Sequence, residues 1–143
     1  MENYEQYNEL LQRPLLLWRG FLVAEVIIFL GLLIFCLKYK IKNGPILMVI
    51  IGFILALTIY LFLILPFQKD IEENAYTTYT GEFYVVGSYF SNASYIEIQF
   101  PDQEKSVRYH LLCDNSYIDD HTQYEGTLVY STRTKCLVDI ILP

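Results

Sequence analysis

Residues 18–40 read WRGFLVAEVIIFLGLLIFCLKYK, and this stretch decides how the fold of the whole chain is interpreted. From Phe21 to Leu37 every residue is apolar or Gly except Glu25. A run of this length and composition is typical of a helix that crosses a membrane. A carboxylate inside such a helix is costly, which makes Glu25 a candidate functional group.

Two aromatic residues frame this stretch. Trp18 and Tyr39 are 21 residues apart, which is about 31 Å at the rise of an α-helix and fits aromatic belts at the two membrane interfaces. Glu25 then lies about 10 Å inside the first interface. If Glu25 had to stay outside the membrane, only residues 26–37 would remain, and about 12 residues are too few to span it. We therefore expect Glu25 within the span.

A second apolar run follows almost at once. Residues 45–67 are 23 residues without a charge, enough to cross roughly 30 Å of hydrocarbon. The two runs predict a membrane-embedded helical hairpin over residues 14–67, with spans at about 18–38 and 45–67. Residues 1–13 are then a polar N-terminal segment that lies on the membrane surface or remains frayed.

The turn between the two runs carries three lysines, Lys38, Lys40 and Lys42. Because basic residues close to membrane spans favour the cytoplasmic side, the turn is expected in the cytoplasm. The chain would then be a two-pass protein of the plasma membrane, with residues 68–143 on the extracytoplasmic side.

Residues 68–143 are acidic, with 12 Asp and Glu against five Lys and Arg, a net charge of −7. Nucleic acids are bound mainly through basic residues, so a nucleic-acid partner is excluded. Anionic lipid headgroups are disfavoured for the same reason. The expected partners are the lipid bilayer itself and another membrane or envelope protein.

The same residues predict a small all-β domain, because runs rich in Tyr, Val, Ile and Thr alternate with turn residues. Ile96, Ile98 and Phe100, for example, share one face of a strand. The expected strands are 78–90, 94–100, 105–113, 124–131 and 134–142. Five short strands suggest a closed barrel of the OB or SH3-like type, and a flat meander resting on the membrane is the competing arrangement.

The layout of two spans followed by an OB-like module, together with the run VYSTRTKCLVDI at Val129 to Ile140, resembles small uncharacterised membrane proteins of Gram-positive bacteria. The resemblance covers the layout and this one segment. It implies a membrane location and a compact β module, and it carries no catalytic motif.

A tight hairpin centred near residue 41 or 42 suggests partners within the two spans. Glu25 would lie level with Thr58 and about half a turn from Tyr60, and either hydroxyl could donate to the carboxyl. Gly31 would face Gly52, which would let the two backbones approach closely. Glu25 is then a neutral residue hydrogen-bonded within the hairpin, a residue that reaches toward the membrane interface, a contact for a basic residue in a partner's span, or a proton or ion relay.

The remaining candidates are weaker. Cys113 and Cys136 could form a disulfide in an oxidising compartment, or remain buried free thiols. A loop near the end of the third expected strand contains the weak metal candidates Asp114, Asp119, Asp120 and His121. Their hard oxygen ligands could hold calcium, but the loop lacks EF-hand spacing, and a solvated acidic loop is the simpler interpretation.

Tyrosine favours protein interfaces, so the tyrosines of the acidic region are candidates for a partner surface. They are Tyr76, Tyr79, Tyr84, Tyr89, Tyr95 and Tyr117. No phosphate loop, zinc-ligand spacing or catalytic motif is present in the sequence, so we expect neither a cofactor nor an enzyme.

The expected function is non-enzymatic binding, as an accessory or regulatory subunit of a membrane complex. One alternative is an immunity-type protein that neutralises a toxin acting at the membrane. The other is a membrane-anchored enzyme of the envelope, which would require His110 and the loop 114–123 to share a deep pocket.

Overall fold

The computed structural model describes residues 4–90, 94–114 and 116–143. They fall into two compact units. One is formed by Arg13–Gln68, and the other by Met1–Gln12 together with Lys69–Pro143. We refer to the first as the hairpin unit and to the second as the sheet unit.

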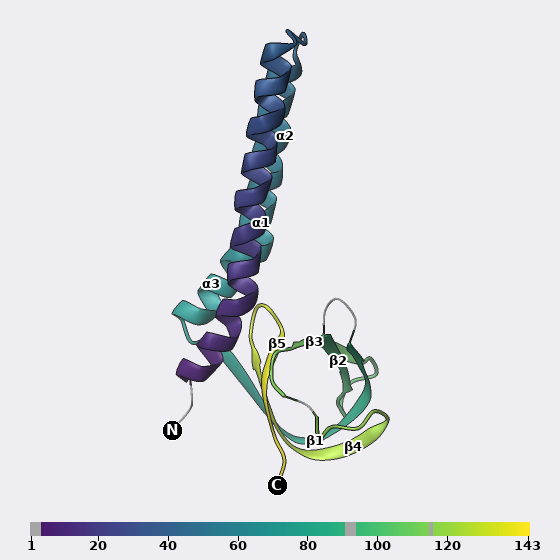
Figure 1. Ribbon diagram of the computed structural model, residues 1–143. Coiled ribbons are helices and arrows are strands. Elements are labelled where there is room, and N and C mark those ends of the chain that lie inside the picture. Colours follow the sequence, from purple (N-terminus) through teal and green to yellow (C-terminus); the bar gives the residue numbers. More distant parts are fainter. Residues whose placement is uncertain (1–3, 91–93, 115) are drawn as a thin grey trace. The chain divides into compact units, whose positions relative to one another are not determined.

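The hairpin unit consists of two long apolar helices joined by a short turn (Figure 1). The helical elements are α1 (Tyr4–Lys38), α2 (Gly44–Ile59), the π-helical turn η1 (Tyr60–Ile64) and α3 (Leu65–Glu72). Lys40 and Asn43 adopt left-handed backbone conformations, with φ of 50° and 62°, and this reverses the chain. Pro45 lies in the first turn of α2, where its missing N–H leaves no hydrogen bond unmade.

Two prolines lie within the helical segments, and the chain accommodates them differently. α1 continues through Pro14 without a break, so the helix predicted to begin near residue 18 begins at Tyr4. η1 comes just before Pro66, and its wider turn is closed by a hydrogen bond from the N–H of Leu65 to the carbonyl of Tyr60. In a regular helix the ring of Pro66 would clash with the carbonyl of Phe62, which the wider turn relieves.

The sheet unit contains all five predicted strands, with ends that differ from the prediction by at most two residues. They are β1 (Tyr76–Phe90), β2 (Ser94–Gln99), β3 (Val107–Leu111), β4 (Thr122–Ser131) and β5 (Cys136–Ile141). β1 pairs with both β2 and β4, β2 with β3, and β4 with β5, all antiparallel, while β3 and β5 are parallel. The pairings follow the order β1-β2-β3-β5-β4 and return to β1, so every strand has two neighbours (Figure 1).

The core of this unit comes from inward-facing side chains of all five strands, together with Phe100 just after β2 and Ile118 in the loop before β4. Ile96 and Ile98 are fully buried and Phe100 is 6% exposed, as the alternation in the sequence predicted. In β3 the alternation holds for Tyr109 and Leu111, both buried. The other members of the core are Phe83, Val85, Ile118, Leu128, Leu137 and Ile140.

Glycines allow the sheet to bend. The register between β1 and β2 shifts between Val85 and Gly87, which places Gly87 at a bulge. At Gly126 a Cβ atom would lie 2.5 Å from the carbonyl oxygen of Ile141. That distance is far below van der Waals contact, so only Gly lets β4 approach the end of β5 this closely.

The first turns of α1 pack within the sheet unit. The Tyr7 hydroxyl donates to Asp139 Oδ2 at 2.9 Å, and the Tyr76 hydroxyl donates to Asn8 Oδ1 at 2.6 Å. The rings of Tyr4 and Tyr76 stack with centroids 5.8 Å apart. Burial raises the pKa of Tyr76 well above its usual range, so its hydroxyl remains a donor.

A buried carboxylate fixes the turn between β4 and β5. Asp70, at the end of α3, is fully buried. It accepts hydrogen bonds from the backbone N–H of Arg133 and Thr134, at 3.2 and 2.9 Å, and from Nη1 of Arg133 and Oγ1 of Thr134, at 3.2 and 3.0 Å. Glu73 forms an additional, more exposed ion pair with Arg133.

Candidate functional site

Glu25 is buried between α1 and α2 although it lies in the middle of an apolar helix. Only 8% of the residue is exposed. In the part of the chain that the structure describes, neither carboxylate oxygen has a hydrogen-bond partner. None of the three ion pairs among the described residues includes it. A buried carboxylate without a donor is unusual, because such groups are nearly always paired in folded proteins.

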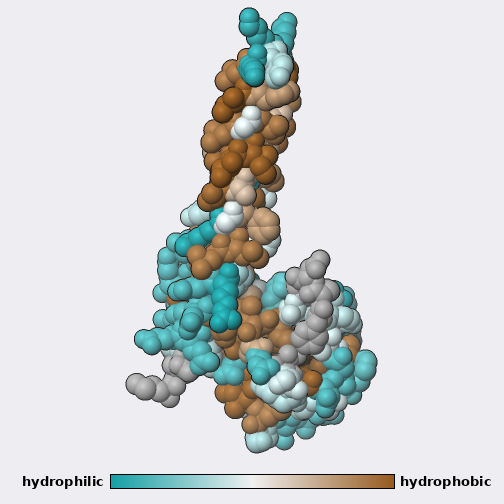
Figure 2. All heavy atoms as spheres, viewed as in Figure 1, coloured by the Kyte–Doolittle hydropathy of each residue, from teal (hydrophilic) through white to brown (hydrophobic). Residues whose placement is uncertain are grey.

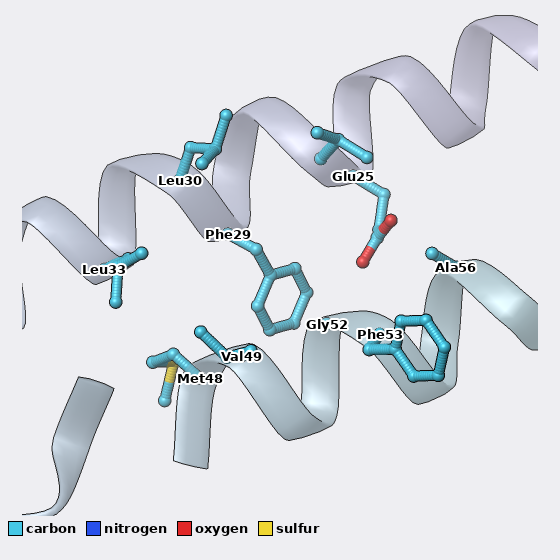
Figure 3. A pocket seen from close by; sticks show the side chains of 10 residues that line it. Glu25, Phe29, Leu30, Leu33, Met48, Val49, Gly52, Phe53 and Ala56 are labelled. Atoms are coloured by element: carbon cyan, nitrogen blue, oxygen red, sulfur yellow. The ribbon is translucent and has the colours of Figure 1, made fainter. Parts of the chain in front are cut away.

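The carboxylate points from α1 toward α2, into a groove of about 250 Å³ between the two helices (Figure 3). Every other residue of its lining is apolar. Val26, Phe29, Leu30 and Leu33 come from α1, and Met48, Val49, Gly52, Phe53 and Ala56 from α2. Glu25 and Ala56 lie at one end of the groove, and Leu33 and Met48 at the other (Figure 3). We refer to this feature as the Glu25 groove.

Helical spacing explains why these residues meet. Glu25, Phe29 and Leu33 follow one another at intervals of four and therefore share one face of α1. Met48, Gly52 and Ala56 follow the same interval on α2. This spacing is visible in the sequence, and from Glu25 it predicts Phe29 and Leu33 on α1, whereas the residues of α2 that face them depend on the register between the helices.

Gly52 permits the close approach of the helices, but its neighbour is not the predicted one. A Cβ atom at Gly52 would lie 3.0 Å from the ring of Phe29, whereas one at Gly31 would meet nothing within 4 Å. The expected contact between Gly31 and Gly52 is therefore not made. The helices are offset by about two residues from the symmetric register that we assumed, because the ring of Phe29 fills the space that Gly52 leaves.

The same offset separates Glu25 from Thr58. The Thr58 hydroxyl donates to the carbonyl of Ile54 at 2.8 Å, one turn earlier in its own helix, as Thr commonly does in an apolar helix. Tyr60 lies in the π-helical turn and is 41% exposed. The expected hydrogen bond between Glu25 and these hydroxyls is not present, and Ala56 lines the groove beside Glu25 instead.

The cysteines are all free thiols. In the parallel pairing of β3 with β5, Cys136 lies opposite His110, and Leu137 opposite Leu111. Cys113 lies two residues beyond Leu111, so the ladder does not bring it beside Cys136. The disulfide that we considered between Cys113 and Cys136 is not formed.

The acidic loop has no grouping of side chains suited to a metal in the described residues. Asp120 accepts hydrogen bonds from the backbone N–H and the hydroxyl of Ser88, both at 2.7 Å. Asp114 accepts from the N–H of Ser116 at 3.0 Å, as in a local turn. The backbone N–H of Asp119 donates to Tyr124, and His121 has a left-handed backbone with φ of 58°.

The six candidate tyrosines differ in their surroundings. Tyr76 packs against the first turns of α1, and Tyr79 against Phe100, with ring centroids 4.5 Å apart. Tyr89 is exposed and stacks on Tyr95, with centroids 4.7 Å apart. Tyr84 and Tyr117 are exposed on the sheet unit. The hydroxyl of Tyr117 donates to the carbonyl of Ile140.

Comparison of the chain with known protein families, with curated proteins and with solved structures finds no match. The function is therefore inferred from the residues themselves, and among these the Glu25 groove has the most unusual chemistry. A buried carboxylate beside apolar walls can accept hydrogen bonds, pair with a cation or hold a proton.

Proposed function

We propose that this protein is a two-pass membrane protein that binds another membrane protein through its helical hairpin, as an accessory or regulatory subunit. The single observation that carries this proposal is Glu25, a buried carboxylate in an apolar groove with no partner of its own among the described residues. Ionisable groups within membrane spans are costly and are retained mainly where they serve a function or meet a partner.

The outward-facing residues of the hairpin support the membrane location. Both helical segments are long and apolar enough to span a membrane. In the most apolar window of α1 only 11% of the residues are buried, and in that of the second helix none is. Figure 2 shows hydrophobic residues covering the helical hairpin. In water such a surface would aggregate, whereas in lipid it is the expected one.

The strand pairing supports an OB-type barrel for the sheet unit. A ring of five strands in which every strand has two neighbours leaves no free sheet edge, which is the property that defines barrel closure. The bulge at Gly87 and the close approach at Gly126 supply the bends that a small barrel needs. In the topology that the lysines of the hairpin turn favour, the acidic residues of this unit lie on the extracytoplasmic side.

The binding proposal can be tested with a photoreactive amino acid in membranes of the cells that naturally express the protein. Phe53 lines the groove and is 67% exposed, whereas Ile27 is equally exposed, at 63%, but does not line it. We expect the photoreactive residue at Phe53 to give one protein adduct of defined mass, and the residue at Ile27 to give none. A differently tagged second copy shows whether that adduct contains this chain twice.

Equal labelling from both positions would contradict a binding groove, as would labelling from neither. An adduct that contains only two copies of this chain would replace the accessory-subunit proposal with self-association.

The proposed topology can be tested by labelling introduced cysteines with a membrane-impermeant maleimide. Glu104→Cys lies in an exposed turn of the sheet unit, and Ile41→Cys lies in the hairpin turn and preserves its three lysines. We expect Glu104→Cys to be labelled in intact cells and Ile41→Cys only after the cells are opened. The opposite pattern would place the sheet unit in the cytoplasm.

The three native thiols leave this experiment a low background, and Cys36 is buried in the hairpin unit. Burial, reinforced by the nearby Asp139 carboxylate, raises the pKa of the Cys113 thiol to about 12, and burial raises that of Cys136 to about 11. Because maleimide reacts with the thiolate, both react slowly at pH 7. The parent chain without an introduced cysteine measures what remains.

A further inference from the structure

We infer that the Glu25 groove receives one membrane helix of a different protein, and that this helix carries a single Lys or Arg that pairs with Glu25. This inference rests on the proposed function and names the chemistry of the partner.

The groove lacks a partner for its one polar group. Its walls consist of nine apolar residues, and its one polar group is a carboxylate that is more than nine-tenths buried and points into the groove. The hairpin supplies no hydrogen-bond partner for either carboxylate oxygen, and the hydroxyl of Thr58, which the sequence suggested, donates to Ile54. A donor or cation for this carboxylate therefore has to come from outside the hairpin.

The second step excludes a second copy of this chain as the occupant. No Lys, Arg or His lies between Arg19 and Lys38 in the sequence, and none between Lys42 and Lys69. Another copy would therefore bring no cation to the level of Glu25, and the polar side chains within its two apolar runs are its own Glu25, Thr58 and Tyr60. Two carboxylates facing each other repel when both are charged. Charge complementarity therefore favours a different protein with a cation.

The third step is the match of shape and depth. Lys and Arg have an apolar stem and a charged end, which suits a groove with apolar walls and a carboxylate at one end. Glu25 is seven residues beyond Trp18, or about 10 Å along the helix. The cation is therefore expected about seven residues from one end of the partner's span.

The experiment uses three designed membrane peptides of 23 Leu and Ala residues as defined probes. One carries Lys at position 7, one carries Lys at the centre, and one has only Leu and Ala. The purified full-length chain is placed in phosphatidylcholine vesicles with each peptide at pH 7. Energy transfer between a donor on the peptide and an acceptor on the protein measures association.

We expect the peptide with Lys at position 7 to bind about tenfold more tightly than the uncharged peptide, which corresponds to about 1.4 kcal/mol. The affinity of the peptide with a central Lys should exceed that of the uncharged peptide by much less. Equal binding of the charged and uncharged peptides would overturn the inference on the unaltered protein, without recourse to any variant.

Two variants separate the inference from the proposed function. Glu25→Gln retains a hydrogen-bonding amide but no charge, and should bind the peptide with Lys at position 7 no more tightly than the uncharged peptide. Ala56→Phe fills the groove and should weaken the binding of all three peptides. Helix content measured by circular dichroism should stay the same in both.

The outcomes are distinct. If Ala56→Phe weakens binding but Glu25→Gln retains the preference for Lys, the groove binds helices and the cation pairing is wrong. If Ala56→Phe changes nothing, the groove is not the binding surface and the proposed function fails with the inference.

Discussion

Replacing Asp70 by Ala should lower the free energy of unfolding of the sheet unit by about 3–5 kcal/mol. Asp70 is fully buried and accepts four hydrogen bonds from Arg133 and Thr134, two of them from backbone N–H groups. Without the carboxylate those donors lose one buried acceptor that holds the whole turn. A domain of this size has a total free energy of unfolding of roughly 4–11 kcal/mol, so much of its stability would be lost.

The measurement is urea unfolding of the purified protein in detergent, followed by the near-ultraviolet circular dichroism of its tyrosines. Glu73→Ala is the matched control, because Glu73 contacts the same arginine but its side chain is 53% exposed. That substitution should have a much smaller effect, since water screens an exposed ion pair. Similar losses in the two variants would mean that the buried carboxylate does not fix the turn between β4 and β5.

Replacing Phe83 by Ala should also lower the free energy of unfolding by about 3–5 kcal/mol. Phe83 is 1% exposed in the core, with its ring 6.0 Å from that of Tyr124. Removing the ring leaves a cavity that the paired strands cannot close, because each is held by two neighbours.

The adjacent residue provides the control for Phe83. Tyr84 lies on the same strand but faces outward, with 37% of its surface exposed. Tyr84→Ala should change stability by about 0.5 kcal/mol or less. If the two substitutions had equal effects in urea unfolding, β1 would not have the inward and outward faces described above.

The sequence predicted the elements of this fold because local patterns encode them. Long apolar runs define the helices, and the alternation at Ile96 and Ile98 defines the inward face of β2. The sequence did not predict the contacts between these elements with the same accuracy. Glu25 was assigned to Thr58 from a symmetric hairpin, but an offset of about two residues is enough to replace Thr58 by Ala56, and the packing of Phe29 against Gly52 is what sets it.

The sheet unit illustrates the same limit of local patterns. Asp70 lies in a polar stretch after the second apolar run, and nothing near it in the sequence indicates that it binds a turn 63 residues later. Likewise, Cys136 begins β5, but Cys113 lies two residues beyond the end of β3, although both cysteines fall within the predicted strands. Whether they meet depends on the register between β3 and β5, which only the parallel pairing determines.

The parallel pairing of β3 with β5 imposes an order on synthesis and folding. β5 is flanked by β3 and β4 and contributes the fully buried Leu137, so the ring of strands cannot close until residues 136–141 have left the ribosome. The helical hairpin is made earlier. Until β5 arrives, β3 and β4 each have one unpaired edge, and such edges promote aggregation. Quality control should therefore act most strongly on chains that stall before Cys136.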